Sequence, residues 1–254
     1  MKRAVCLFMV LSIASVTARA EEKKGAELTD PVEILKKVDA ACKAVKTVKY
    51  DVVFEGLGES KARVGKVEAT VILSGFVYGA PEKILIDAKA TAPGSTDVRR
   101  ITGGGDGEMF FVVDHQAKKA YEDLDQQVVG SFGRTLHAGV MIEFLVDDPF
   151  GHEINGKSKE LRGSKEINGV DCYEVHVVYA TESEQAATWY FSKKDFLPRK
   201  RIDEFTLRGD RMPSGQKFRQ QKTISNLVVD PKLDKDTFKL KLPEGYTKTD
   251  DFAP

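Results

Sequence analysis

The chain has 254 residues, of which 41% are hydrophobic, so it is long enough to bury a sizeable core. It carries 39 basic and 39 acidic residues and has a formal net charge of zero at pH 7. This balance leaves no basic field that would attract nucleic acid or an anionic membrane surface, so we expect neither as a partner.

The N-terminus, residues 1–20, has the features of a cleaved signal peptide. Lys2 and Arg3 form a basic start, residues 4–16 are mostly apolar, and Ala18-Arg19-Ala20 has the small-residue pattern of a signal peptidase site. The apolar run is too short for a stable membrane helix. Cleavage would leave 36 basic and 39 acidic residues. We therefore expect an exported, mildly acidic mature chain of residues 21–254.

Two cysteines remain after this cleavage, Cys42 and Cys172. Export permits a disulfide, but two cysteines do not make a disulfide framework. The sequence leaves open whether the two form a bridge or are two buried thiols.

A helix is predicted to begin at Pro31. Asp30 can accept a hydrogen bond at the N-cap, Pro31 suits the first helical position, and Glu33 completes a capping box. Apolar residues then recur at helical spacing and form one stripe, which must pack against another element. The stripe consists of Ile34, Leu35, Val38, Ala41, Cys42 and Val45.

From residue 48 onward the apolar period changes to two, which indicates β-strands. Strands are predicted over residues 48–55, 67–76, 83–90, 109–114, 118–124 and 217–229, with several more between 161 and 205. Such short runs between turn residues are typical of an antiparallel meander. Asn168-Gly169 predicts a two-residue type I′ hairpin, because both central positions of that turn need positive φ.

The glycine-rich residues 103–107 have the composition of a phosphate-binding loop but not its context. They lack the Gly-Lys-Ser/Thr ending, and a strand rather than a helix follows them. We interpret them as a connection between two strands.

A second helix is predicted over residues 131–145, where the strands are interrupted. It either packs in the core or lines an apolar ligand cavity, and the residues alone do not separate these alternatives. The apolar residues at helical spacing are Phe132, Leu136, Val140 and Phe144, with Met141 and Leu145 beside them.

Catalytic and metal-binding motifs are not recognisable in this sequence. None of the four histidines has another ligand at metal-binding spacing, so we expect no metal site. Cys172, Glu174 and His176 alternate on one strand, but such neighbours diverge sideways, which favours an ordinary polar sheet face over a nucleophilic group. We expect no enzymatic activity and no cofactor.

Two short basic runs lie within strand patterns, Arg99-Arg100 and residues 199–201. At alternating positions they would form a solvated face or protect an edge strand. A single arginine that points inward could instead hold a polar head group.

Short motifs are spread over nearly the whole predicted mature chain. They are Asp106-Gly107 before Met109 to Asp114, with Lys119 and Tyr121; Asn168-Gly169-Val170-Asp171-Cys172-Tyr173, Thr188-Trp189-Tyr190-Phe191 and Leu197-Pro198-Arg199; and Asp236-Thr237-Phe238 with Leu242-Pro243-Glu244-Gly245. With the order of the elements, these motifs resemble the LolA-like family of periplasmic lipoprotein carriers and lipoprotein-sorting proteins.

The resemblance implies a mainly β (α+β) fold, an incompletely closed antiparallel β-barrel with helices covering its concave face, as a single domain over residues 21–254. It also implies an apolar cavity in which acyl chains leave water, at about 0.8 kcal/mol for each buried CH₂. Candidate lining residues are Tyr50, Val52, Phe54, Phe111 and Trp189 on the sheet and Phe132, Leu136, Val140, Met141 and Phe144 on the predicted second helix.

The function that the resemblance implies is an exported periplasmic carrier of an acylated lipid or lipoprotein, acting in outer-membrane lipoprotein sorting. Inner- or outer-membrane sorting proteins would then be its partners. The alternative is a periplasmic sensor or protein-interaction module with the same fold and no lipid transport, and a hydrolase is a third hypothesis. A continuous apolar interior would favour the carrier, whereas an interior filled by side chains would favour the interaction module.

Overall fold

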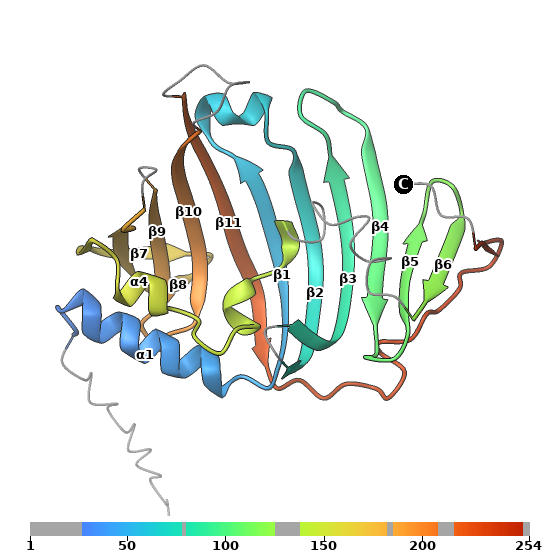
Figure 1. Cartoon of the computed structure of the whole chain (residues 1–254), viewed down its shortest axis with the longest axis horizontal. Coiled ribbons are helices and arrows are strands. Elements are labelled where there is room, and N and C mark those ends of the chain that lie inside the picture. The colour runs from blue at the N-terminus through green and yellow to red at the C-terminus, as the bar shows by residue number, and fades with distance from the viewer. Residues whose placement is uncertain (1–26, 78–79, 125–137, 182–184, 208–215, 251–254) are drawn as a thin grey trace, which may run out of the picture.

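One strongly curved β-sheet forms the body of the molecule (Figure 1). The computed structural model describes residues 27–77, 80–124, 138–181, 185–207 and 216–250. Within these residues the sheet has twelve strands in the order β12-β6-β5-β4-β3-β2-β1-β11-β10-β9-β8-β7. Neighbouring strands are antiparallel, except that β12 pairs parallel with β6. Because β7 and β12 do not pair with each other, the sheet is not closed.

The strands of this sheet are β1 (Thr47–Gly56), β2 (Lys66–Val77), β3 (Ala80–Thr91), β4 (Val98–Gly105), β5 (Phe110–Asp114), β6 (Lys119–Asp123), β7 (Ser158–Ile167), β8 (Val170–Val178), β9 (Ala186–Ser192), β10 (Pro198–Leu207), β11 (Gln216–Val229) and β12 (Thr247–Lys248). The described helices are α1 (Pro31–Ala44), the short α4 (Gly151–Ile154) and the 3₁₀-helices η1 (Gly58–Ala62) and η2 (Ile142–Phe144).

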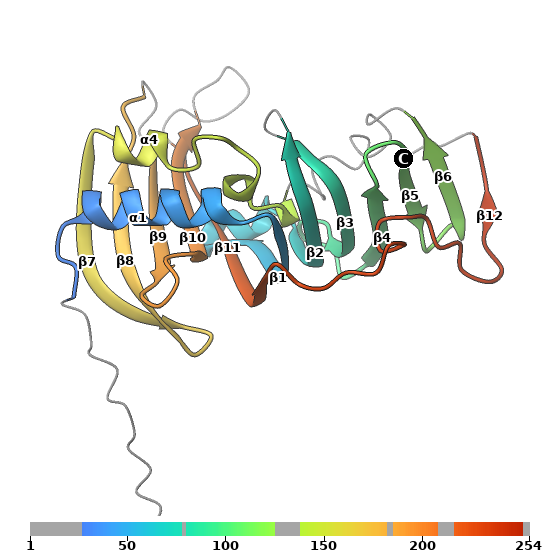
Figure 2. The same ribbon diagram turned by 90° about the horizontal axis from the view of Figure 1, so that it is seen from below.

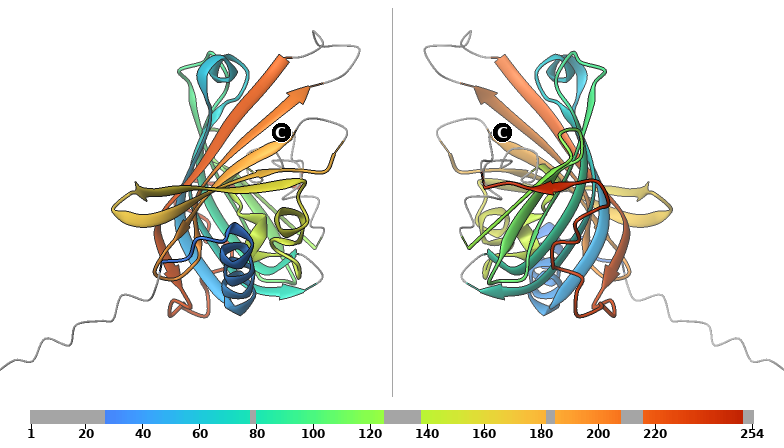
Figure 3. Two further views of the ribbon diagram at one scale, coloured as in Figure 1. Left: turned by 90° about the vertical axis from the view of Figure 1, so that its left-hand side faces the viewer. Right: turned by 90° about the vertical axis from the view of Figure 1, so that its right-hand side faces the viewer.

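Helix α1 confirms the predicted first helix. The Asp30 side chain accepts a hydrogen bond from the backbone N–H of Val32 at 2.9 Å, and Pro31 occupies the first turn. Helix α1 lies across β7 to β10 on the same side of the sheet as α4 (Figures 2 and 3), and its residues Ile34, Leu35, Val38 and Cys42 are buried. The predicted fold, a mainly β, incompletely closed half-barrel with helices on the concave face, is therefore confirmed.

The hairpin between β7 and β8 also follows the prediction. Asn168 and Gly169 have φ angles of 49° and 80°, and Ile167 pairs directly with Val170. Both central residues thus have the positive φ of a type I′ turn. This turn fixes the register of the edge hairpin.

The prediction that residues 103–107 only connect two strands is wrong for the first three glycines, which lie inside β4. Gly104 and Gly105 pair with Phe111 and Phe110 of β5. A Cβ atom on Gly104 would lie 2.7 Å from the Phe111 ring, so the glycine makes room for the aromatic side chain. The strand pattern was hidden because glycine carries no side chain to alternate.

The predicted second helix does not extend to Leu145. Residues 131–137 lie outside the described residues, Ala138 and Gly139 are helical, Met141 is extended, and Ile142–Phe144 forms the separate 3₁₀-helix η2. The Tyr50 hydroxyl accepts from the N–H of Met141 at 2.9 Å and donates to the carbonyl of Gly139 at 3.3 Å. The Tyr50 side chain therefore forms hydrogen bonds with two backbone groups that, in a continuous helix, would form hydrogen bonds within the helix.

The core is divided between the two faces of the sheet. The main cluster lies on the concave face beneath α1 and η2 and includes Leu35, Val175 and Trp189.

Cys42 and Cys172 are both buried and free, so the two form no bridge. Among the described residues, no helix is both long and apolar enough to cross a membrane.

Candidate functional site

A groove of about 740 Å³ opens on the concave face next to the part of the sheet that α1 covers. Its floor comes from β1, β2, β3, β4, β10 and β11, and residues 138–143 form one wall. The turns around residues 63–66 and 92–97 form its rim. No residue of α1 or α4 lines this groove, whereas Ile142 and Glu143 of η2 belong to its wall.

One residue from each of six neighbouring strands forms a single cross-strand row along the floor. In order these are Arg201 (β10), Lys222 (β11), Phe54 (β1), Val67 (β2), Ala90 (β3) and Arg99 (β4), each paired directly with the next. All six line the groove. The row, called the floor row below, is apolar in the middle and cationic at both ends. Measured along the curved sheet, the backbone positions of Lys222 and Arg99 are four strand spacings of about 4.8 Å apart, about 19 Å.

The wall is held onto the sheet by polar contacts rather than by apolar packing alone. Besides the two hydrogen bonds of Tyr50, the Lys222 ammonium donates to the carbonyl of Val140. Glu143, which is 4% exposed, accepts from the Arg201 guanidinium at 2.8 Å. The wall therefore encloses the Arg201 and Lys222 end of the floor row.

Arg201 is the most constrained cation of the groove. It also donates to Asp203 at 2.5 Å and lies 4.6 Å from the centroid of the Trp189 ring. Burial lowers the pKa of Arg201, but the carboxylates of Glu143 and Asp203 outweigh this effect and raise its pKa overall. Arg201 is therefore a fixed positive charge with two carboxylate partners.

Lys222 lies beside Arg201 in a different electrostatic environment. Burial lowers the pKa of the Lys222 ammonium, the Glu143 carboxylate opposes that shift, and the neighbouring charge of Arg201 adds to it. Lys222 thus presents a desolvated ammonium at the enclosed end of the groove.

The ten residues predicted to line a cavity are distributed over several environments. Phe54 and Met141 line the groove. Tyr50, Val52, Phe144 and Trp189 are at most 2% exposed and belong to the main core, against which the half-buried Val140 packs. Phe132 and Leu136 lie outside the described residues.

Phe111 does not join the other predicted lining residues. Alternation along β5 places Val112 in the main core and Phe111 on the opposite face of the sheet. There Phe111 belongs to a separate cluster with Leu240 and Tyr246 of the C-terminal segment. The expectation that Phe111 lies on the same face as Tyr50 and Trp189 is therefore wrong.

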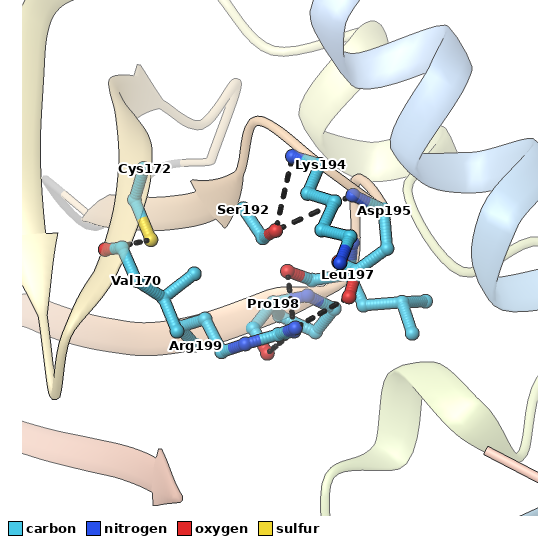
Figure 4. A network of polar contacts seen from close by, with 8 residues as sticks. All are labelled: Val170, Cys172, Ser192, Lys194, Asp195, Leu197, Pro198 and Arg199. Carbon is cyan, nitrogen blue, oxygen red and sulfur yellow. Dashed lines mark hydrogen bonds and ion pairs between the residues drawn. The ribbon is translucent and has the colours of Figure 1, made fainter. Parts of the chain in front are cut away.

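The basic runs noted in the sequence separate into different roles. Arg199 stabilises the turn between β9 and β10 by donating to Asp195 at 2.5 Å and to the carbonyl of Leu197 at 3.1 Å (Figure 4). Arg100 forms a two-point ion pair with Asp87. Of the arginines in these runs, only Arg99 and Arg201 line the groove.

Sequence reasoning missed Val67, Ala90, Lys222, Glu143 and Asp203 as lining residues. Lys222 alternates with Ile224 on the predicted strand, which could have indicated a cation on an inward face.

The described ranges contain no group of three His, Cys, Asp or Glu side chains placed to hold a metal ion. The chemistry of the groove is thus that of apolar contact and charge recognition.

Comparisons with known proteins identify the fold. No protein-family model and no curated protein matches the sequence. LprF from Mycobacterium bovis is 12% identical with a TM-score of 0.50, covering 87% of this chain and 100% of LprF. Lipoprotein LppX from Mycobacterium tuberculosis is 11% identical with a TM-score of 0.47, covering 80% of this chain and 96% of LppX. A LolA superfamily protein from Nitrosomonas europaea is 12% identical with a TM-score of 0.33, covering 84% and 99%.

At this sequence identity the similarity to LprF concerns the fold alone, and the two lower scores carry no argument. The open antiparallel half-barrel of this chain therefore has the fold of LprF.

Proposed function

We propose that this chain is an exported carrier that binds one acylated small ligand in the groove on its concave face. In this proposal, residues 1–20 are a signal peptide, and residues 21–254 act as one domain outside the cytoplasm. Delivery of lipids or lipoproteins between membranes, with membrane sorting proteins as partners, is the process that this role would serve.

The groove of about 740 Å³, with Phe54, Val67 and Ala90 in the middle of its floor, is the observation that carries this proposal. Small-molecule pockets typically enclose roughly 300–1,000 Å³, so this volume is sufficient for an acylated small ligand. An acyl chain on this floor would gain about 0.8 kcal/mol for each CH₂ that leaves water. No catalytic group is required for such binding.

Filling the groove tests the proposal. Ala90 is half-buried on the floor, and Ala90→Trp would place an indole where the acyl chain is expected. We expect uptake of a fluorescent fatty acid to weaken at least about tenfold, which corresponds to about 1.4 kcal/mol. Ala40→Trp, at an exposed position of α1, is the matched control and should bind like the unmodified protein.

Native mass spectrometry of protein purified from an exporting host provides the second measurement. A co-purifying lipid or acylated peptide, lost in Ala90→Trp and kept in Ala40→Trp, would support the carrier. If the unmodified protein neither retains a lipid nor takes up the fluorescent fatty acid, the carrier proposal fails.

A protein-interaction module remains the second candidate because much of the concave face is filled by side chains. Under α1 and α4, the Phe150 ring packs edge-on against Trp189 and Phe191, with centroids 5.1 and 5.3 Å apart. A lipid has no room in this packed part. Recovery of a stoichiometric protein partner, equally bound by Ala90→Trp, would favour this second candidate.

A further inference from the structure

Strand β7 lies at one end of the sheet, and its outer side pairs with no strand of the described ranges (Figure 2). It is 10 residues long, and all residues from Arg162 to Glu166 are exposed. An edge strand presents backbone N–H and C=O groups to which another strand can pair, and charges or a bulge usually prevent this pairing. The arrangement of the charges on β7 therefore decides whether a second strand can pair there.

A β-bulge at Arg162 changes which side chains of β7 share a face. Before the bulge, Glu160 pairs with His176 of β8, and after the bulge, Lys165 pairs with Cys172. His176 and Cys172 are four residues apart on one strand, so both point to the same face of the sheet. Glu160 and Lys165 therefore also share that face, although residues five apart on a regular strand would point to opposite faces.

The charges of β7 complement those of an antiparallel copy of the same strand. A two-fold axis perpendicular to the sheet places a second β7 antiparallel to the first and keeps each face on its own side. When Arg162 lies opposite Gly163 of the second copy, Glu160 lies opposite Lys165 of that copy. The symmetry repeats this pair of opposite charges, so the interface contains it twice.

Neighbouring registers do not give this match. A shift of the second copy by two residues in one direction places Arg162 opposite Lys165, which are like charges. A shift by two residues in the other direction leaves neither Glu160 nor Lys165 opposite a charged residue. In the matched register, Lys159 also comes opposite Glu166. The charge pattern therefore favours one register of β7 with itself.

Both charges of the repeated pair are placed near the edge of the sheet. The Glu160 side chain is 63% exposed, and its ion pair with Arg162 on the same strand is 3.1 Å long. Lys165 is exposed, and its ammonium lies 6.0 Å from the centroid of the Tyr190 ring. Exposed ion pairs contribute little to stability, so exchanging the Arg162 contact of Glu160 for one across the interface costs little.

We propose that two copies of the exported chain associate through β7, so that their sheets continue into each other across an antiparallel β7–β7 pair. No residue of β7 lines the groove, and each copy would keep its groove accessible. A single pair of strands is a small interface, so we expect a dissociation constant in the micromolar range. This surface goes beyond the carrier function proposed above and does not depend on it.

Sedimentation of the mature protein over a series of concentrations tests the association, and we expect a monomer–dimer equilibrium. Glu160→Lys and Lys165→Glu each replace two symmetry-related pairs of opposite charges by like charges. Each variant alone should weaken the dimer about tenfold or more. Glu59→Lys, at an exposed position of η1, is the matched control and should change the dissociation constant by less than about threefold.

An equimolar mixture of Glu160→Lys and Lys165→Glu provides the sharpest test. Between these two variants, both pairs of facing charges are again opposite in sign. We therefore expect a heterodimer about as stable as the unmodified dimer, detected by sedimentation with one variant fluorescently labelled. The double variant Glu160→Lys/Lys165→Glu should likewise dimerise, since it exchanges the two charges within each copy.

Three outcomes would overturn the inference. They are an unmodified protein that stays monomeric at all concentrations, a dimer that neither single variant weakens, and single variants that do not associate when mixed. Far-UV circular dichroism shows whether the single variants are folded. If one of them is not, the double variant decides: a dimer supports pairing through β7, and a monomer contradicts it.

Discussion

Two regions of the same concave face have opposite packing. Over β7 to β10, α1 and α4 cover the sheet, and fully buried aromatic side chains such as Phe150, Trp189 and Phe191 fill the space. We call this region the packed half. Over β11 and β1 to β4, the floor is built mostly from smaller apolar side chains and long cations, and the groove is present. We call this region the open half.

The difference shows that the buried aromatic residues of the concave face, such as Phe150, Trp189 and Phe191, mark its core rather than the groove, where Phe54 is the exception. An aromatic side chain brings a large apolar area to a core, but it also fills the space that a ligand would need. On the floor of the open half, Val67 and Ala90 leave that space, and Lys222 and Arg99 border it. We therefore expect substitutions in the packed half to act on stability and substitutions in the open half to act on binding.

The largest effect is expected for Phe150→Ala in the packed half. Phe150 is completely buried between Trp189 and Phe191, so its truncation should lower the free energy of unfolding by about 3–5 kcal/mol, measured by urea denaturation. Fatty-acid affinity, corrected for the folded fraction, should remain within about threefold of the unmodified value.

Phe54→Ala is the matched substitution in the open half. Phe54 is half-buried on the groove floor, so the loss of stability should be about half as large, and the loss of affinity should exceed that of Phe150→Ala. If Phe150→Ala reduced binding more than Phe54→Ala did, the division into two halves would be wrong.

A smaller effect on the free energy of unfolding is expected when the pH is changed, and it comes from Glu153 in the packed half. Burial raises the pKa of Glu153 above its ordinary value of 4.5, and the hydrogen bond from the Tyr179 hydroxyl, 2.7 Å long, opposes that shift in part. Between the ordinary pKa and the raised one, the folded state therefore binds more protons than the unfolded state. Stability from this group is present below pH 4.5 and is lost as pH rises through the folded-state pKa.

Glu153→Gln should remove this dependence, because the amide has no proton to lose and its oxygen can still accept from Tyr179. The stability of the unmodified protein relative to this variant should fall as pH rises from about 4 to about 7. Glu244→Gln, at an exposed position, is the control and should give no such trend. A flat or rising difference for Glu153→Gln would show that the carboxyl is not desolvated.

Local signals in the sequence were sufficient for much of the fold. The Asp30-Pro31 start predicts α1, and Asn168-Gly169 predicts the hairpin between β7 and β8, because each depends on residues that are adjacent in sequence. The period-two runs likewise predict most strands. Their arrangement as an open half-barrel came from the family resemblance rather than from any one pattern.

The groove could be predicted only in small part. The face of Phe111 was ambiguous, because it lies in an unbroken apolar run, Met109 to Val113, that is buried on both sides of the sheet. The floor row depends on the register between six strands, which no single strand reveals. The wall is shaped by Tyr50 and Lys222, residues that are distant in sequence from the backbone groups they bind.

Hydrogen–deuterium exchange with and without dodecanoate tests most directly whether the ligand occupies the open half. The amides of residues 138–143 and of the rim at residues 92–97 lie outside the regular strands, so added protection there is readily measured. We expect the ligand to slow exchange at these two segments and to leave α1 and α4 unchanged. Slower exchange in α1 or α4, with no change at residues 92–97 and 138–143, would contradict the assignment of the groove as the binding site.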